Sequence, residues 1–167
     1  MQPVIYYCNP NIYPEEEYIV RKEELTRYAR RQGLEVVDGD YDHAEWLRHV
    51  KGLEHEPERG NRCMECFKLR MLRSAEKCAE LGLGTFTTTL ASSRWKSLGQ
   101  INEAGRWAQL QVNDRYGAEV VTFWNRNWRK GGLQERRNAL LRENGFYNQQ
   151  YCGCEYSQGT VSSIHSS

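Results

Sequence analysis

Two tight pairs of cysteines constrain this chain more than any other feature. The first pair is Cys63-x-x-Cys66, and the second, far along the chain, is Cys152-x-Cys154. Paired thiolate sulfurs are the ligands that hold zinc ions and iron–sulfur clusters in proteins. A fold that gathers both pairs collects four such ligands. We therefore expect Cys63, Cys66, Cys152 and Cys154 to bind a metal ion or a cluster.

The two remaining cysteines have simpler interpretations. Cys8 follows a predicted strand and is a candidate fifth ligand, although an unpaired cysteine more often packs as a small buried hydrophobe. Cys78 lies on the apolar side of a predicted helix, which indicates a core position. The spacing of the pairs leaves a structural zinc open as an alternative. Thiol–disulfide exchange at Cys63 and Cys66 is a third possibility, but it gives the second pair no purpose.

Length and composition narrow the class of protein. A chain of 167 residues suits one globular domain, and a formal net charge of +1 means that a nucleic-acid binder must cluster its basic residues locally. We find no apolar run long enough to cross a membrane and no pattern typical of a secretory signal. Six cysteines in such a chain favour reduced thiols in a cytoplasmic protein over a disulfide scaffold.

Predicted strands and helices alternate along the chain. The apolar and turn patterns predict strands at residues 4–7, 34–37, 85–90 and 119–123. They predict helices at about residues 14–32, 43–51, 63–81, 97–116 and 133–143. This order implies an α/β fold, a parallel sheet flanked by helices, with ligands beyond the carboxyl ends of its strands. Residues 1–157 are expected to form a single α/β metal-binding domain, and the serine-rich residues 158–167 a disordered tail.

A basic and aromatic loop follows the last predicted strand. Cations alternate there with an indole, and two further cations follow the third strand. Such a surface can hold phosphates while it stacks an unpaired base, although a charge run is also typical of a solvated face. The candidate nucleic-acid-binding residues are Arg126, Trp128, Arg129, Lys130, Arg94 and Lys96. The histidines lack the spacing of a ligand set, and we interpret all of them as surface residues: His43, His49, His55 and His165.

Longer strings surround the cysteines. They include Tyr6-Tyr7-Cys8-Asn9-Pro10-Asn11-Ile12, Arg62-Cys63 with Cys66, Phe86-Thr87-Thr88-Thr89-Leu90 and Gln150-Tyr151-Cys152-Gly153-Cys154-Glu155-Tyr156-Ser157. In order and spacing these strings resemble the epoxyqueuosine reductase QueH family, over nearly the whole chain from Tyr6 to Ser157. The last string is highly specific to that family.

The resemblance implies an activity and a cofactor. Family members reduce epoxyqueuosine to queuosine at the wobble position of tRNA, the last step of queuosine biosynthesis. The family implies a HUP-like α/β fold, a [4Fe–4S] cluster with an additional iron, contact with the tRNA anticodon loop and an unidentified electron donor. On this resemblance Cys63, Cys66, Cys152 and Cys154 become the metal ligands. No catalytic residue is assigned, and the possible proton donors are Asp114, Glu58 and Tyr156.

The sequence departs from the family at its start. Family members usually begin with a strand and a loop that carries adjacent cysteines and a Pro-Cys pair, whereas this sequence passes from Met1-Gln2-Pro3 almost directly into the next segment. We therefore expect the first strand–helix unit and its metal ligands to be absent, either through truncation or a mis-assigned start, or through divergence. The loss leaves open a non-catalytic tRNA-binding protein whose four cysteines hold a structural zinc.

Overall fold

The computed structural model describes residues 2–158, and the chain divides into two compact units. Unit 1 combines the N-terminal segment up to His55 with the C-terminal segment from Phe146, and unit 2 spans Glu56–Gly145. Most of the predicted tail, residues 159–167, lies outside the described residues, and so does His165. The single domain expected for residues 1–157 stays a prediction.

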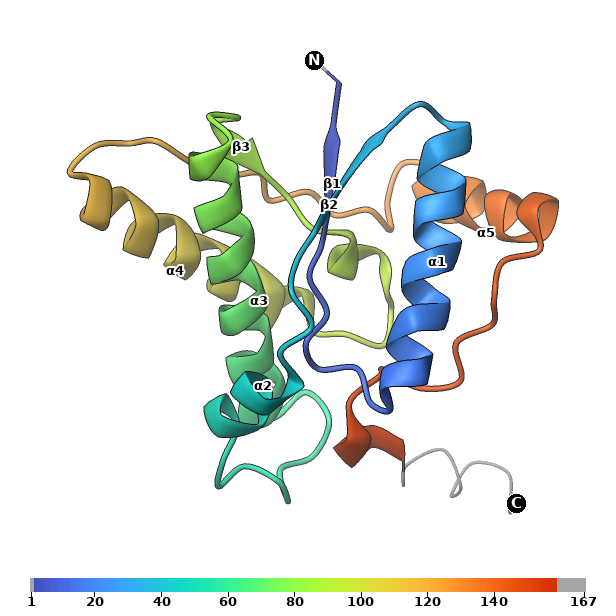
Figure 1. Cartoon of the computed structure of the whole chain (residues 1–167), viewed down its shortest axis with the longest axis horizontal. Coiled ribbons are helices and arrows are strands. Elements are labelled where there is room, and N and C mark those ends of the chain that lie inside the picture. The colour runs from blue at the N-terminus through green and yellow to red at the C-terminus, as the bar shows by residue number, and fades with distance from the viewer. Residues whose placement is uncertain (1, 159–167) are drawn as a thin grey trace. The chain divides into compact units, whose positions relative to one another are not determined.

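Unit 1 is built on one strand–helix–strand element. Its elements are β1 (Val4–Tyr7), α1 (Glu15–Arg31), β2 (Glu35–Asp38), α2 (His43–His49) and the 3₁₀ turn η2 (Glu155–Ser157). Strands β1 and β2 pair in parallel, with Val4 opposite Glu35 and Tyr7 opposite Asp38 (Figure 1). Pro14 precedes α1, and three glutamates in the first turn complement the positive end of the helix dipole. Tyr7, Ile12 and Tyr18 form the buried centre of this unit.

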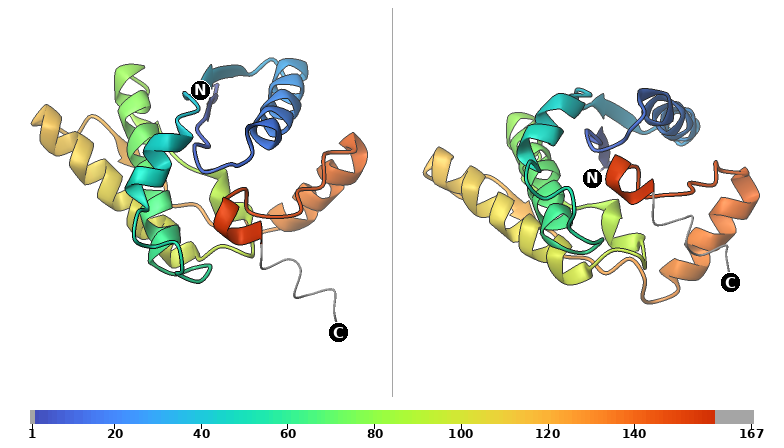
Figure 2. Two further views of the ribbon diagram at one scale, coloured as in Figure 1. Left: turned by 60° about the horizontal axis from the view of Figure 1, so that its bottom comes forward. Right: turned by 90° about the horizontal axis from the view of Figure 1, so that it is seen from below.

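Unit 2 pairs two long helices with two short strands. Its elements are α3 (Asn61–Glu80), β3 (Thr85–Phe86), the 3₁₀ turn η1 (Thr89–Ser92), α4 (Leu98–Tyr116), β4 (Thr122–Phe123) and α5 (Leu133–Asn144). Helices α3 and α4 pack along one another, and both views of Figure 2 show them side by side. Strands β3 and β4 are parallel, with Thr85 opposite Thr122 and Phe86 opposite Phe123.

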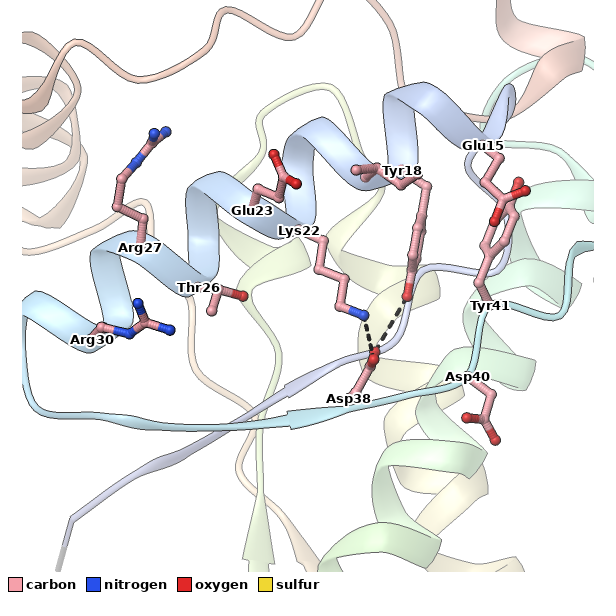
Figure 3. Close-up of a pocket in the computed structure, with 11 residues that line it drawn as sticks. Glu15, Tyr18, Lys22, Glu23, Thr26, Arg27, Arg30, Asp38, Asp40 and Tyr41 are labelled. Carbon is pink, nitrogen blue, oxygen red and sulfur yellow. Dashed lines mark hydrogen bonds and ion pairs between the residues drawn. The ribbon is translucent and has the colours of Figure 1, made fainter.

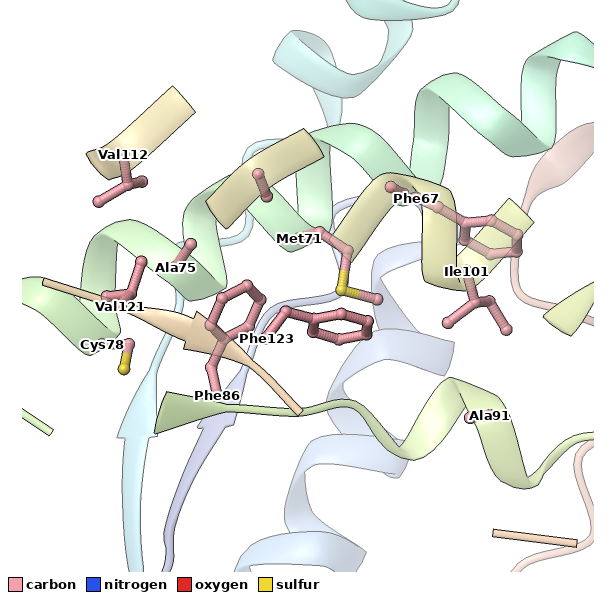
Figure 4. Close-up of a cluster of buried hydrophobic side chains, with 12 residues drawn as sticks. Phe67, Met71, Ala75, Cys78, Phe86, Ala91, Ile101, Val112, Val121 and Phe123 are labelled. Carbon is pink, nitrogen blue, oxygen red and sulfur yellow. The ribbon is translucent and has the colours of Figure 1, made fainter. Parts of the chain in front are cut away.

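The core of unit 2 fixes how closely α4 approaches β4. Met71 of α3, Phe86 of β3 and Phe123 of β4 point toward one another in Figure 4, and the two phenyl rings lie 5.3 Å apart. A Cβ atom at Gly105 would lie 2.4 Å from the ring of Phe123, so only glycine permits this contact. The helix face that carries Gly105 therefore packs directly on the sheet.

The predicted fold class is confirmed: the described chain is a mixed α/β fold with short parallel strands and flanking helices. The strands predicted at 85–90 and 119–123 are shorter than expected. The hydroxyl of Thr88 accepts a hydrogen bond from the Leu90 amide (3.2 Å), which turns the chain into η1. The side chain of Asn113 accepts from the amides of Val120 and Val121, so these amides are not available to lengthen β4.

Among the described helices, none is both long and apolar enough to cross a membrane.

Candidate functional site

The first cysteine pair lies in the opening turns of α3. Cys63 is partly exposed, and Cys66, one turn later, is buried at 8 % exposure. The Glu56 carboxylate caps the helix, because it accepts from the Asn61 amide (3.1 Å) and from Asn61 Nδ2 (3.3 Å). A Cβ atom at Gly60 would lie 2.6 Å from Glu56 Oε2, so glycine lets the carboxylate approach. The loop before α3 thereby fixes the helix end that carries both thiols.

Arg59 joins this thiol end to a second loop. Its φ of 66° lies in the left-handed region, which costs an ordinary residue roughly 1 kcal/mol. In this conformation its amide donates to Cys63 Sγ (3.3 Å). Its guanidinium donates to the carbonyls of Trp95 (Nε, 2.9 Å) and Arg94 (Nη2, 3.2 Å). Gln100 of α4 holds the Arg59 carbonyl (2.8 Å), so the backbone of Arg59 is fixed as well.

The structure gives Arg129 a role in holding the backbone. Its guanidinium donates to the carbonyls of Ala91 (3.0 Å), Lys96 (3.0 Å) and Ser93. Together Arg59 and Arg129 engage the four consecutive carbonyls of residues 93–96. Arg129 therefore positions the loop that carries Arg94 and Lys96, a role that sequence reasoning missed.

The other candidate nucleic-acid-binding residues lie around the same loops of unit 2. The indole of Trp128 donates to the Thr88 carbonyl (3.0 Å), and the Arg126 guanidinium lies 5.9 Å from the Trp128 ring. Lys96 Nζ lies 5.8 Å from the ring of Phe67, which directly follows Cys66 in α3. Arg94, Arg126 and Lys130 are exposed. Lys96, Arg94 and Arg129 are thus brought to the thiol end of α3.

The second cysteine pair lies in a tightly held segment of unit 1. Arg21 of α1 donates to the carbonyls of Tyr151 and Cys152, and the Tyr13 amide donates to the Gly153 carbonyl (2.8 Å). The Cys154 carbonyl accepts from the amide (3.0 Å) and the hydroxyl (2.6 Å) of Ser157. Four consecutive carbonyls, of residues 151–154, are therefore engaged. The side chain of Cys152 remains exposed while Cys154 is buried at 7 % exposure.

Gly153 makes this arrangement possible. Its φ of 109° is open to glycine alone among common residues, and an added Cβ atom would lie 2.8 Å from Cγ1 of Ile12. The segment that faces Gly153 is the loop Asn9-Pro10-Asn11 together with Ile12. Asn11 there is 1 % exposed, and its Oδ1 accepts no hydrogen bond from the described residues. The family string at the C-terminus thus packs on the family string near the N-terminus.

Cys8 and Cys78 are both buried. Cys8 follows β1 in unit 1, at 6 % exposure, and its role as a fifth ligand stays a prediction. Cys78 packs in the hydrophobic core of unit 2, as predicted, and burial raises the pKa of its thiol.

The interpretation of His43 as a surface residue is wrong. Its side chain is 13 % exposed, and its ring nitrogens lie 2.8 Å from the Pro10 carbonyl (Nδ1) and 2.7 Å from Glu155 Oε1 (Nε2). The ring also stacks on Tyr13 and Trp46. The sequence did hold a signal for the burial of His43. It lies three residues before the apolar Trp46, and residues at this spacing share a helix face. The other two described histidines, His49 and His55, are exposed as predicted.

A pocket of about 630 Å³ lies between α1 and β2 in unit 1 (Figure 3). Lys22 and the Tyr18 hydroxyl (3.5 Å) both reach the Asp38 carboxylate there. Burial, with a smaller effect of Asp38, raises the pKa of Tyr18. None of the predicted site residues lines this pocket, so it is distinct from the thiol segments.

The donor atoms of the two thiol pairs show whether these residues suit the [4Fe–4S] cluster that the family resemblance implies. Each pair presents two soft sulfur donors on a fixed backbone, and four such donors are the usual ligands of a [4Fe–4S] cluster. Within residues 2–158, no group of three or more His, Cys, Asp or Glu side chains stands ready to hold a metal ion. The donor types fit the cluster, and the sharing of one centre by both pairs stays a prediction.

Comparisons with known proteins agree with the residue strings. A sequence model of the family described as "Epoxyqueuosine reductase QueH" matches residues 1–160. Curated proteins of that name from Histophilus somni and Haemophilus influenzae are each 44 % identical over 153 residues, which is 92 % of this chain and 60 % of the relative. The protein of that name from Acinetobacter baylyi is 41 % identical over 92 % of this chain and 67 % of its own length. The chain thus spans 60 % of the length of the first two relatives.

Proposed function

Because this chain belongs to the epoxyqueuosine reductase QueH family, we propose that it reduces epoxyqueuosine to queuosine at the wobble position of tRNA, the last step of queuosine biosynthesis. The observation that carries the proposal is the family match over residues 1–160, which includes both cysteine pairs. The fixed backbones of these pairs support it, since a redox centre needs ligands that do not rearrange. A tRNA substrate makes the cytoplasm the site of the reaction.

The chemistry requires a source of electrons. Removal of the epoxide oxygen to leave an alkene consumes two electrons and two protons and releases water. No ordinary side chain supplies such an electron pair, so a redox cofactor is needed. We propose a [4Fe–4S] cluster with an additional iron, held by Cys63, Cys66, Cys152 and Cys154. When bound, the cluster would relay electrons from a donor protein that is not yet identified.

The residues near the first pair support ligation by thiolates. The Arg59 amide donates to Cys63 Sγ, and a hydrogen-bond donor stabilises negative charge on sulfur. The opening turn of α3 adds the positive end of its helix dipole, and Lys96 adds a cation near Phe67. These groups favour the charge state in which cysteine binds metal.

The three possible proton donors differ in their position. Asp114 lies fourteen residues along α4 from Gln100, the residue that contacts Arg59, which corresponds to about 21 Å of helix. Asp114 therefore lies far from the first thiol pair, and we favour the other two candidates. Glu58 lies exposed in the loop before α3, and Tyr156 stacks on Trp46 beside the second pair. Glu58 and Tyr156 remain the candidates to supply protons.

Contact with tRNA is proposed for the basic loops of unit 2. Arg94, Arg126 and Lys130 are exposed cations, suited to phosphate groups of the anticodon arm. Trp128 and Lys96 are further predicted contacts with the RNA, and Arg129 contributes by holding the loop that carries Lys96.

Purification without oxygen tests the proposal. The expected result is a brown protein with iron and acid-labile sulfide that reduces epoxyqueuosine in tRNA when a chemical reductant is supplied. Two double variants distinguish one centre shared by both cysteine pairs from two independent centres. They are Cys63→Ala with Cys66→Ala, and Cys152→Ala with Cys154→Ala. If the pairs share one centre, each double variant loses all of the cluster, whereas independent centres would leave part of the iron in each.

Cys78→Ala is the matched control, because Cys78 is a core residue and the iron content should not change. A colourless protein that contains zinc and binds tRNA without turnover would support the alternative, a non-catalytic tRNA-binding protein with a structural zinc. Full turnover in the Cys152 and Cys154 variant would instead indicate a thiol exchanger.

A further inference from the structure

Trp95 is an exposed indole beside the first thiol pair. Its exposed fraction is 69 %, the highest among the large apolar side chains that the structure describes as exposed. An aromatic ring left in water forgoes the stabilisation that burial would give it. Such exposure calls for an explanation in the surrounding structure.

The backbone under Trp95 is fixed from both sides. Arg59 donates to the carbonyls of Arg94 and Trp95, and Arg129 donates to those of Ser93 and Lys96. Two guanidinium groups from separate parts of unit 2 therefore hold every carbonyl of residues 93–96. The exposure of the indole is consequently a property of an ordered loop.

Two cationic residues, Arg94 and Lys96, flank the indole in the chain. The Arg94 guanidinium lies 5.1 Å from the centre of the Trp95 ring, within the range of a cation–π contact. The carbonyl dipoles of the loop, which would otherwise attract cations, already accept hydrogen bonds from arginines. An aromatic ring flanked by cations is the combination by which proteins hold single-stranded nucleic acid: the ring stacks on a base and the cations contact phosphates.

We propose that Trp95 is the stacking platform for one unpaired base of the substrate RNA, and that Arg59 and Arg129 are positioning residues for this platform. The inference rests on the proposed action on tRNA and adds to it a binding residue that was not among the predicted contacts. Because the Arg59 amide also donates to Cys63, the platform and the thiol pair share one support. A base stacked on Trp95 would be held near the end of α3 that carries the pair.

The test measures RNA affinity of the full chain in the presence of a chelator and a thiol reductant, with no turnover. The probe is a fluorescently labelled, unmodified anticodon stem–loop, and a fully paired RNA duplex of equal length is the comparison. Trp95→Ala is expected to weaken stem–loop binding by about tenfold and to leave duplex binding unchanged, because base–aromatic stacking requires an unpaired base. Trp95→Phe keeps a ring and should retain most of the affinity.

Tyr116→Ala is the matched control. Tyr116 is 57 % exposed at the opposite end of α4 from Gln100, so its loss should change neither affinity. Arg129→Lys and Arg59→Lys keep the charge but lose the planar guanidinium whose separate nitrogens reach two or more carbonyls, so each should weaken stem–loop binding and spare the duplex. The substituted Trp95 side chain is exposed, and a melting curve unchanged from the wild type confirms that the variant folds.

The inference is overturned if Trp95→Ala binds the stem–loop as the wild type does, or if it loses stem–loop and duplex binding equally. Its failure is distinguishable from failure of the proposed function. A chain that stacks the stem–loop on Trp95 but never reduces epoxyqueuosine refutes the reductase alone. A chain that turns over while Trp95→Ala binds normally refutes the platform alone.

Discussion

Arg21 in α1 donates hydrogen bonds from Nη2 to the Tyr151 carbonyl (3.0 Å) and from Nη1 to the Cys152 carbonyl (3.3 Å), 130 and 131 residues further along the chain. Its Nε also pairs with Glu17 (2.7 Å), and the residue is only 8 % exposed. A single side chain thus attaches the second cysteine segment to the first helix. In unit 2, Arg59 and Arg129 hold residues 93–96 in the same manner.

The substitution Arg21→Ala should lower the free energy of unfolding by about 3 kcal/mol, since the partly buried Glu17 carboxylate loses its cationic partner and two carbonyls lose their arginine donor. Urea denaturation measures the change. The neighbouring exposed pair of Lys22 with Asp38 supplies the control, and Lys22→Ala should cost less than about 1 kcal/mol. Equal effects of the two substitutions would show that Arg21 does not hold the segment.

The substitution Gly153→Ala should destabilise unit 1 by about 3 kcal/mol, because it adds a clash with Ile12 to a backbone conformation that alanine rarely adopts. Gly33→Ala provides the comparison. Gly33 also has a positive φ (67°), but no atom lies within 4 Å of an added Cβ, so the expected cost is only about 1 kcal/mol. Thermal melting of the two variants gives the difference, and an identical melting temperature would argue against the close packing of Gly153 on Ile12.

The substitution Asn113→Ala should destabilise unit 2 by about 2 kcal/mol, since it removes the acceptor for the amides of Val120 (2.9 Å) and Val121 (3.0 Å) and the donor to the Val121 carbonyl (3.0 Å). Denaturant unfolding is the measurement. Gln111, exposed on the same helix, is the control residue, and Gln111→Ala should change stability by less than about 0.5 kcal/mol. A comparable loss in both variants would contradict the bridging role of Asn113.

Alkaline pH should reduce the contribution of Cys78 to stability. Burial raises the pKa of this thiol above its ordinary value of 9.0, so the folded state holds the proton more tightly than the unfolded state does. The stabilisation is complete below pH 9 and declines as the pH rises toward the folded-state pKa. The difference in unfolding free energy between the wild type and Cys78→Ala should therefore be smaller at pH 10 than at pH 8. A difference that stays constant over this interval would contradict the burial of Cys78.

Local signals predicted the helices well. Pro14 and the glutamates after it begin α1, and Gly33 and Gly82 follow the ends of α1 and α3, because these residues act within one or two turns of the backbone. The lengths of β3 and β4 depended instead on Thr88 and Asn113, whose side chains accept hydrogen bonds from backbone amides. The periodicity of apolar residues does not reveal which backbone amides a side chain will bind.

The sequence by itself determined the family, the alternation of strands and helices, and the two thiol pairs. Each of these features depends on residues that lie close together in the chain. Only the tertiary structure decided what the arginines do. Arg21, Arg59 and Arg129 look like surface cations in the sequence, but their guanidinium groups meet carbonyls from distant segments, and such partners are set by the path of the folded chain. The same reason explains why His43 and Trp95 were overlooked: burial and exposure follow from which segments pack together.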